Sequence, residues 1–304
     1  MRFAIPHPIP YQGSKRQLAP AILSFIPRGK YKRLIEPFAG SAAVTLAVAS
    51  QGLCERYLIS ELLPPLADLW RELVARPASL TNRYRALWNS QQPNPQARFN
   101  EIRAEFNADH DPAKLLYLLA RCVKNAVRFN PAGQFNQSPD NRRLGVKPDT
   151  AEQEIWGAHR LLAGRCAVLC GDFRQTLQHA TEDDLVYLDP PYEGTSNGRD
   201  RRYIRGVQRD ELVQTLHDLN RRGVQFLLSY DGTCGAKPYG KPLPTFLRAH
   251  RVHLDAGRST QATLAGKNLK TIESLYVSSG LCEGRRVPAA LHWKEPARGA
   301  LLFE

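Results

Sequence analysis

The side chains best suited to chemistry follow a short apolar strand. Residues 185–188 read Leu-Val-Tyr-Leu, which predicts a buried strand, and Asp189, Pro190, Pro191 and Tyr192 come directly after it. Neither proline has an amide hydrogen and each fixes φ, so the backbone turns stiffly and leaves its carbonyls outside the sheet. The Asp189 carboxylate and the Pro190 carbonyl offer two acceptors for the hydrogens of an –NH2 group, and Tyr192 offers a ring for stacking. The pattern predicts a holder for the exocyclic amine of a planar base.

Chance frequency separates this motif from an ordinary strand end. Two prolines alone are more typical of a strand that simply stops. With typical residue frequencies, Asp-Pro-Pro-Tyr arises by chance in roughly one chain of this length in several hundred. The motif is therefore moderately specific, and its interpretation depends on the motifs elsewhere in the chain.

The charge of the chain favours a polyanionic partner. Its 304 residues include 42 Lys plus Arg against 29 Asp plus Glu, a formal net charge of +13, and the excess is spread along the sequence. Phosphate contacts supply much of the affinity of nucleic-acid-binding proteins. Because a basic protein can also be merely soluble, the expectation of a nucleic acid rests on the motifs described below.

Cysteine usage and hydropathy predict a cytoplasmic protein without a metal. The six cysteines are scattered, with no Cys-x-x-Cys pair and no histidines at zinc spacing, so we expect reduced structural thiols and no required metal. No signal-peptide region opens the sequence, and no uncharged apolar run approaches the length of a membrane span. We therefore expect the bacterial cytoplasm or nucleoid and no membrane association.

A turn of mixed chemistry lies near the first residue. Residues 10–15 combine an aromatic ring at Tyr11, a glycine and a cation at Lys15, and they precede a helix expected over residues 18–26. Such a turn is able to contact a charged ligand. In isolation it is more typical of an ordinary N-terminal turn.

A strand, a glycine turn and a helix come next. Residues 34–35 predict the strand, residues 44–49 predict the helix, and the turn between them contains Glu36, Phe38 and Gly40. Small residues around Gly40 let a ligand approach the backbone at the helix N-terminus, as in nucleotide-binding βαβ units.

Acids at the ends of two later strands favour an adenosine-containing cofactor. A strand at residues 57–59 ends at Glu61, where a carboxylate accepts both hydroxyls of a ribose. Another, at residues 167–170, is followed by Asp172 and Phe173. Asp172 then offers an acceptor for an adenine amino group and Phe173 a ring to pack on it, whereas a simple Gly-Asp turn is the plainer interpretation.

Apolar periodicity predicts four helices after Glu61. They cover residues 66–73, 84–89, 99–106 and 115–120. Arg121, Lys124 and Arg128 follow at three- and four-residue spacing, which predicts three cations on one face of the continued helix. The helices alone are typical of a cover on a sheet.

A polar, non-periodic segment over residues 130–149 contains Asn130, Arg142, Arg143 and Lys147. Amides among basic residues suit contacts to base edges and phosphates. A solvated loop is the alternative, and we favour nucleic acid for this segment.

The last third of the chain alternates strands and helices, which predicts an α/β fold. Directly after the tetrapeptide, a loop over residues 193–206 contains Arg199, Arg201 and Arg202 and is placed to close over the site and onto phosphate. The remaining expected elements are helices at 156–163 and 209–222, strands at 224–230, 250–254 and 271–277, and a turn at 231–232.

Together these motifs resemble the DNA adenine methyltransferases, particularly the Dam-like group in which the cofactor motif precedes the Asp-Pro-Pro-Tyr motif. The resemblance spans roughly residues 8–278 and is carried by 11–15, 36–41, 61, 128–130, 133–136, 172 and 189–192. In such enzymes the matching residues hold S-adenosylmethionine. Here that implies Tyr11, Lys15, Glu36, Phe38, Gly40, Glu61, Asp172 and Phe173.

Two departures from the family pattern concern the cofactor site. The usual second glycine of Phe-x-Gly-x-Gly is Ala42, and the acid after the second strand is Glu61 where Asp is commoner. Both affect the expected affinity for the cofactor more than its identity.

The resemblance implies a Rossmann-like methyltransferase sheet with helices on both faces, formed by residues 1–61 and 151–280. Residues 62–150 are then a mainly helical DNA-recognition insertion, and residues 281–304 are a C-terminal extension. The partner is double-stranded DNA, with a separately encoded restriction endonuclease as a possible companion.

The implied reaction transfers a methyl group to the exocyclic amine of adenine in a specific duplex sequence. Acceptance of both N–H hydrogens at Asp189 and the Pro190 carbonyl aims the nitrogen lone pair at the sulfonium methyl group. The target base is flipped out of the helix and stacks on Tyr192, with no covalent enzyme intermediate. Alternatives are cytosine amine methylation, RNA methylation and a non-catalytic DNA-binding module.

Overall fold

The computed structural model describes residues 5–191, 207–235, 237–258, 270–283 and 290–291. Tyr192 and the predicted closing loop with Arg199, Arg201 and Arg202 lie outside these residues. Within the described part of the chain, no helix has the length and apolar character needed to cross a membrane.

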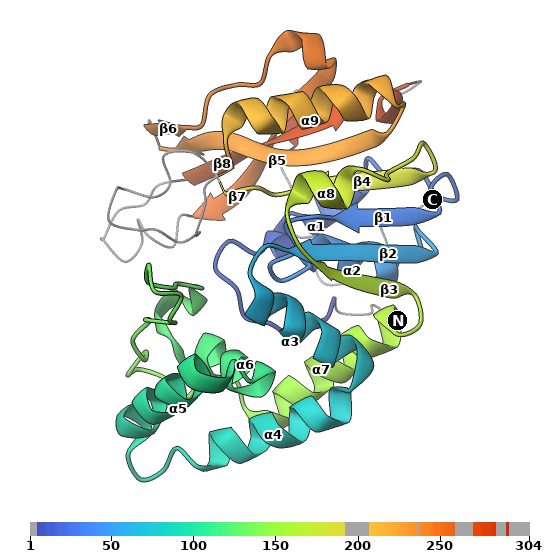
Figure 1. Ribbon diagram of the computed structural model, residues 1–304. Coiled ribbons are helices and arrows are strands. Elements are labelled where there is room, and N and C mark those ends of the chain that lie inside the picture. Colours follow the sequence, from blue (N-terminus) through green and yellow to red (C-terminus); the bar gives the residue numbers. More distant parts are fainter. Residues whose placement is uncertain (1–4, 192–206, 236, 259–269, 284–289, 292–304) are drawn as a thin grey trace, which may run out of the picture.

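One mixed sheet forms the upper part of the molecule in the view of Figure 1, and the helices between β2 and β3 lie below it. Its strands follow the order β3-β2-β1-β4-β5-β8-β7-β9, with β6 paired to β5. The five strands from β3 to β5 are parallel, and β8 is antiparallel to both of its neighbours. The strands are β1 Arg33–Glu36, β2 Arg56–Glu61, β3 Cys166–Cys170, β4 Asp184–Leu188, β5 Gln225–Cys234, β6 Lys237–Tyr239, β7 Ala249–Arg258, β8 Lys270–Ser278 and β9 Ala290–Leu291. The predicted α/β, Rossmann-like class is confirmed.

Helices cover both faces of the sheet because its central strands are apolar on both sides. All of β4 is buried, with Leu185 and Tyr187 in one apolar cluster and Val186 and Leu188 in another. Such a continuous apolar run is typical of a central parallel strand. The covering helices are α1 Ala19–Leu23 and α2 Ala43–Ser50 on the first side and α8 Phe173–Leu177 and α9 Arg209–Arg221 on the second. The 3-10 turns are η1 Lys15–Gln17, η2 Val123–Asn125, η3 Thr245–Leu247 and η4 Ser279–Leu281.

Five helices fill the chain between β2 and β3. They are α3 Pro64–Ala75, α4 Pro77–Asn89, α5 Pro95–Asp109, α6 Pro112–Arg121 and α7 Pro148–Leu162. Each begins with proline, which lacks only an amide hydrogen that the first turn leaves unpaired. The helix ranges predicted from the sequence begin at later residues than the observed helices. The reason is that the first turns contain few apolar residues, so the apolar periodicity does not reach them.

The helical region joins the sheet through α3 and α7, and α4, α5 and α6 lie further away (Figure 1). One apolar cluster runs from the sheet into these helices, with Trp70, Phe106 and Leu118 among its buried members. The predicted boundary at residues 61 and 62 is therefore not marked by a break in the core. The division into a catalytic domain and an insertion stays a prediction.

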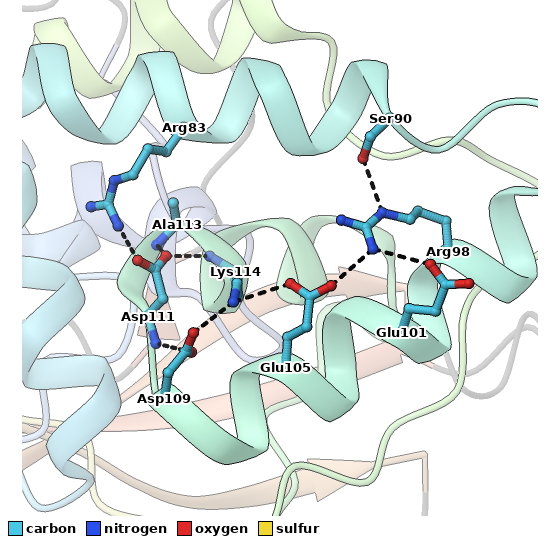
Figure 2. A network of polar contacts seen from close by, with 9 residues as sticks. All are labelled: Arg83, Ser90, Arg98, Glu101, Glu105, Asp109, Asp111, Ala113 and Lys114. Atoms are coloured by element: carbon cyan, nitrogen blue, oxygen red, sulfur yellow. Dashed lines mark hydrogen bonds and ion pairs between the residues drawn. The ribbon is translucent and has the colours of Figure 1, made fainter.

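A network of charged side chains ties α4, α5 and α6 together (Figure 2). Arg98 contacts Glu101 and Glu105 on its own helix, and Lys114 of α6 contacts Glu105 at 3.1 Å. Asp111 caps α6, accepting from the amides of Ala113 and Lys114 at 2.8 and 3.0 Å, and it also pairs with Arg83 of α4. The network fixes the mutual orientation of the three helices.

We expect Asp111→Ala to lower the free energy of unfolding by about 1–2 kcal/mol, because two amides at the start of α6 lose their acceptor. Glu101→Ala removes one exposed ion pair and is the control, with an expected loss below about 1 kcal/mol. Denaturant unfolding followed by circular dichroism measures both. Equal losses in the two variants would contradict the capping role.

A bulge replaces the turn predicted at residues 231–232. Both residues lie inside β5, where the register against β8 shifts between Ser229 and Gly232. Asp231 has φ +50°, and its buried carboxylate accepts from Arg251 at 2.6 Å and from the Tyr276 hydroxyl at 2.5 Å. The predicted turn was wrong because these side-chain contacts hold the strand together through a local irregularity.

Candidate active site

The carboxyl ends of four parallel strands bring the predicted motifs to one edge of the sheet. The glycine turn follows β1, Glu61 ends β2, Asp172 follows β3, and Asp189 follows β4. Strand β1 lies between β2 and β4, so the chain reverses its direction of winding there. Ligands of open α/β sheets bind at this kind of position.

Gly40 is the centre of the cofactor motif. Its φ is +49°, and its amide donates to the Glu61 carboxylate. Its carbonyl accepts from the buried Trp70 indole of α3 at 2.9 Å. A Cβ at this position would lie 3.1 Å from the Tyr11 ring, so only glycine combines this backbone conformation with the close approach of the ring. The turn, the acid and the aromatic ring are thus held as one unit.

The two acids of the cofactor motif are poorly solvated. Burial raises the pKa of Glu61 to about 7, despite the hydrogen bonds from the amides of Gly40 and Leu62. Burial also raises the pKa of Glu36 to about 8, although the amide and hydroxyl of Thr45 both donate to it. Glu36 therefore satisfies the first turn of α2, a structural role beside the predicted cofactor role.

Ala42 occupies the position where the family pattern has a second glycine. It is fully buried and has φ +45°, in the left-handed region that glycine adopts most readily. Its neighbour Ser41 donates to Ser14 at 2.8 Å, which joins this turn to the N-terminal turn. Although Ala42 replaces the glycine of the family pattern, its backbone keeps the left-handed conformation that glycine adopts.

Asp172 caps α8, and its carboxylate pairs with Arg174. Its carboxylate accepts from the Arg174 amide at 2.9 Å and from the guanidinium at 2.8 Å, and that guanidinium lowers the pKa of Asp172. Phe173 is only 5% exposed and packs on Phe38, with ring centroids 5.1 Å apart. The structure thus leaves Phe38 as the more accessible ring, where the sequence pointed to Phe173.

Lys15 lies against the catalytic motif and bridges two carboxylates. Its Nζ is 2.9 Å from Asp189 Oδ1 and 3.5 Å from Glu273 Oε2. Burial lowers the pKa of Lys15, but both carboxylates raise it and leave it above its ordinary value. Lys15 was predicted to contact the cofactor, and the structure adds Asp189 as a direct partner.

Arg121 is not available to DNA, which corrects the sequence prediction. It is 1% exposed and donates to the carbonyls of Asp140 at 3.0 Å, Pro95 at 3.4 Å and Arg143. A side chain surrounded by carbonyls satisfies backbone groups that a buried loop leaves unpaired. Arg121 therefore shapes the segment that follows instead of presenting charge.

The predicted face of three cations does not form. Helix α6 ends at Arg121, Cys122 is extended, and Lys124 has φ +61°. Lys124 is exposed and Arg128 is half-buried on non-helical backbone. The prediction was wrong because the chain leaves α6 to pair with its own downstream segment.

Residues 122–139 form two antiparallel segments that are joined at a short tip. Backbone bridges join Cys122 to Pro139 and Phe129 to Phe135. Asn107 of α5 holds the returning segment, donating to the Phe135 carbonyl at 3.1 Å and accepting from its amide at 2.8 Å. We call residues 122–139 the hairpin segment.

The other residues predicted to contact DNA lie on or after this segment. Asn130 is bonded to Gln134 at the tip through both backbone and side chain, and Lys147 is exposed just before α7. Arg142 is 71% exposed while pairing with Asp140, and this pairing lowers the pKa of Asp140 to about 2. Arg143 is less exposed and donates to the Cys122 carbonyl.

Sequence reasoning missed several residues that support the site. Trp70 and Asn107 act through backbone groups far away in the sequence, and no local signal indicates such contacts. Leu62, 50% exposed beside Glu61, gave no signal either. Glu273 did have one, since it shares a strand face with the buried Leu275 at a spacing where an apolar residue is expected.

The chain is similar to known proteins over most of its length. A family model for the D12 class N6 adenine-specific DNA methyltransferase matches residues 11–281. The retron Ec67 DNA adenine methylase of Escherichia coli is 28% identical over 264 residues, which cover 83% of this chain and 87% of that protein. The DNA N-6-adenine-methyltransferase of Escherichia phage P1 is 28% identical over 235 residues, covering 73% of this chain but only 29% of that longer protein. Type II methyltransferase M.MjaIII of Methanocaldococcus jannaschii is 24% identical over 242 residues, covering 72% and 82%.

The fold and the strand-end motifs define an α/β methyltransferase. The chain belongs to the D12 class of N6 adenine-specific DNA methyltransferases, and the resemblance stated from the sequence is confirmed.

Proposed function

We propose that the protein transfers a methyl group from S-adenosylmethionine to the exocyclic amine of adenine in a specific sequence of duplex DNA. The observation that carries this proposal is the position of Asp189 and Pro190, at the end of β4 and one strand away from the Gly40 turn. An amine held at β4 and a cofactor held at β1 then meet at the same edge of the sheet.

The cofactor motif suits an adenosine group on chemical grounds. The Glu61 carboxylate accepts from the ribose hydroxyls, the Gly40 turn leaves the backbone open to close approach, and Tyr11, Phe38 and the exposed Leu62 offer apolar contacts. Asp172 is 29% exposed beside this site, and the acceptor capacity that its contacts with Arg174 leave on the carboxylate is offered to the adenine amino group. When bound, S-adenosylmethionine supplies an electrophilic methyl group and takes back the electron pair of its S–C bond.

The protein residues act on the amine of the target base. The lone pair of the amine nitrogen is conjugated into the ring of the base. Hydrogen bonds to Asp189 and the Pro190 carbonyl therefore draw the nitrogen toward tetrahedral geometry. Formation of the N–C bond places positive charge on the nitrogen, next to Asp189. The nitrogen then loses one proton, which passes to the Asp189 carboxylate and on to solvent. Tyr192 stacks on the flipped base in this proposal, and Pro191 stiffens the turn.

Cofactor affinity should rise with pH and level off above about 7. The ribose hydroxyls need the ionised Glu61 carboxylate, and its raised pKa of about 7 leaves it protonated at lower pH. Below that value we expect the affinity to fall by up to about tenfold per pH unit, with proton release on binding. Titration calorimetry in buffers of different ionisation enthalpy measures both effects. Glu61→Gln is the control and should show a much flatter pH profile. A wild-type profile as flat as that of Glu61→Gln would remove Glu61 from the ribose site.

The hairpin segment and residues 140–149 are proposed to contact DNA. Arg142 and Lys147 are exposed, the amides of Asn130 and Gln134 lie at the hairpin tip, and Lys124 is exposed at the base of the segment. Asn107 and Arg121 stabilise this region by donating to backbone carbonyls within it. The half-buried Arg128 belongs to the same proposed surface. Arg199, Arg201 and Arg202 lie outside the described residues, and their contact with DNA stays a prediction.

We expect Arg142→Ala to weaken binding of duplex DNA and to reduce the slope of log affinity against log salt by about 1, as expected for one lost phosphate contact. Arg143→Ala should also loosen the loop, because Arg143 holds the Cys122 carbonyl. Fluorescence anisotropy at several salt concentrations provides the measurement, with the distant Arg28→Ala as a charge-matched control. If both loop variants keep wild-type affinity, salt slope and site preference, DNA binding lies elsewhere.

A restriction endonuclease encoded separately is proposed as a companion. Two relatives carry the name Type II methyltransferase, those from Lactococcus lactis and Methanocaldococcus jannaschii. If the companion exists, DNA methylated by this protein should resist it.

A further inference from the structure

We propose that Glu273 of β8 is a positioning residue for methyl transfer, which shares the Lys15 ammonium with Asp189 and so keeps the Asp189 carboxylate available to the target amine. This inference rests on the proposed function, because it concerns the same target amine.

The three side chains meet from three parts of the fold. Lys15 comes from η1, Asp189 from the end of β4 and Glu273 from β8, and β5 separates the two strands. The ammonium is 2.9 Å from Asp189 and 3.5 Å from Glu273, and the side chains are 8%, 20% and 18% exposed. The cluster is therefore well shielded from solvent, and its charges interact more strongly than surface charges do.

The sheet explains why an acid from β8 reaches this point. Glu273, Leu275 and Val277 alternate on β8, and the latter two are buried in the apolar cluster that includes α1. The bulge of β5 lies directly opposite, with Gly232 paired to Glu273 and Asp231 fixed by its own partners. Bulges of this kind re-aim neighbouring side chains next to active sites.

The position of the ammonium gives Glu273 its role. The Lys15 ammonium contacts Asp189 at 2.9 Å and Glu273 at 3.5 Å, so it is not held by Asp189 alone. An ammonium shared in this way leaves the Asp189 carboxylate able to accept from the amine, on which positive charge develops in the transition state.

Loss of the Glu273 carboxylate changes the position of the ammonium. Without Glu273, Lys15 settles fully on Asp189 and competes with the amine for the carboxylate. We expect Glu273→Gln to lower kcat by about 10–100-fold while the KM for DNA and the affinity for S-adenosylmethionine change less than about threefold. Glu273→Asp keeps the charge on a shorter side chain and should recover part of kcat. The exposed Glu55→Gln is the matched control and should behave as wild type.

The test is a double-mutant cycle with Lys15→Met, using kcat from radiolabelled methyl transfer into DNA and thermal unfolding to verify the fold. If Glu273 acts through Lys15, Glu273→Gln costs much less in the Lys15→Met background than in the wild type. Equal costs in both backgrounds, or a wild-type kcat for folded Glu273→Gln, would overturn the inference. Should Glu273→Gln not fold, Glu273→Ala, which also removes the carboxylate, makes the same comparison, and a wild-type kcat for it overturns the inference. A wild-type protein that methylates no DNA would instead overturn the proposed function.

Discussion

Asp189→Ala should abolish methyl transfer while the protein stays folded and still binds DNA. The lost carboxylate is the acceptor that strengthens as positive charge grows on the amine nitrogen. By analogy with a lost oxyanion-hole donor, its removal costs about 3–4 kcal/mol of transition-state stabilisation or more, so turnover should fall at least about a hundredfold. Single-turnover transfer of a labelled methyl group measures the effect.

Asp189→Asn is the matched variant for this experiment. The amide keeps the size of the side chain and one oxygen acceptor but removes the charge that pairs with Lys15. We expect its rate to lie between those of Asp189→Ala and the wild type. A folded Asp189→Ala protein that methylates DNA at nearly the wild-type rate would refute the catalytic role of the β4 end.

Glu61→Ala should weaken S-adenosylmethionine binding by one to two orders of magnitude and leave DNA affinity nearly unchanged. Each lost hydrogen bond to a charged group is worth roughly 1.5–3 kcal/mol. The variant also removes the acceptor of the Gly40 amide, so thermal unfolding must accompany calorimetry. Glu61→Gln keeps an acceptor for that amide and separates loss of the charge from collapse of the turn. Unchanged cofactor affinity in both variants would place the ribose elsewhere.

The sheet, and the edge of the sheet where the candidate site lies, were predictable because each sequence pattern that indicated them was local. The apolar run of β4, its abrupt end at Asp189 and the glycine turn after β1 are properties of consecutive residues. Parallel strands bring such ends together without further information. The order of motifs then indicated the family, which the match over residues 11–281 confirms.

The contacts of the helical region were not predictable in the same way. The spacing of Arg121, Lys124 and Arg128 fits a helix. In the structure the helix ends at Arg121, and the backbone of residue 122 pairs with that of residue 139. Arg121 then becomes the buried donor to three carbonyls of distant residues. Helix propensity is a weak prior against such tertiary contacts.

Glu273 shows a signal that was present but not interpreted. A carboxylate on the apolar face of a strand needs a partner, and the partner was Lys15, more than 250 residues earlier in the chain. Only the fold reveals which cation balances it. The same holds for Trp70, whose indole supports the Gly40 carbonyl from the first helix after β2.

The most direct test of the account is the identity of the methylated nucleoside. Purified protein is incubated with duplex DNA and S-adenosylmethionine labelled in the methyl group, and the DNA is digested to nucleosides and separated by chromatography. We expect the label in N6-methyladenine, with little incorporation into structured RNA and almost none with Asp189→Ala. Label in N4-methylcytosine, or no label in DNA with folded wild-type protein, would contradict the account.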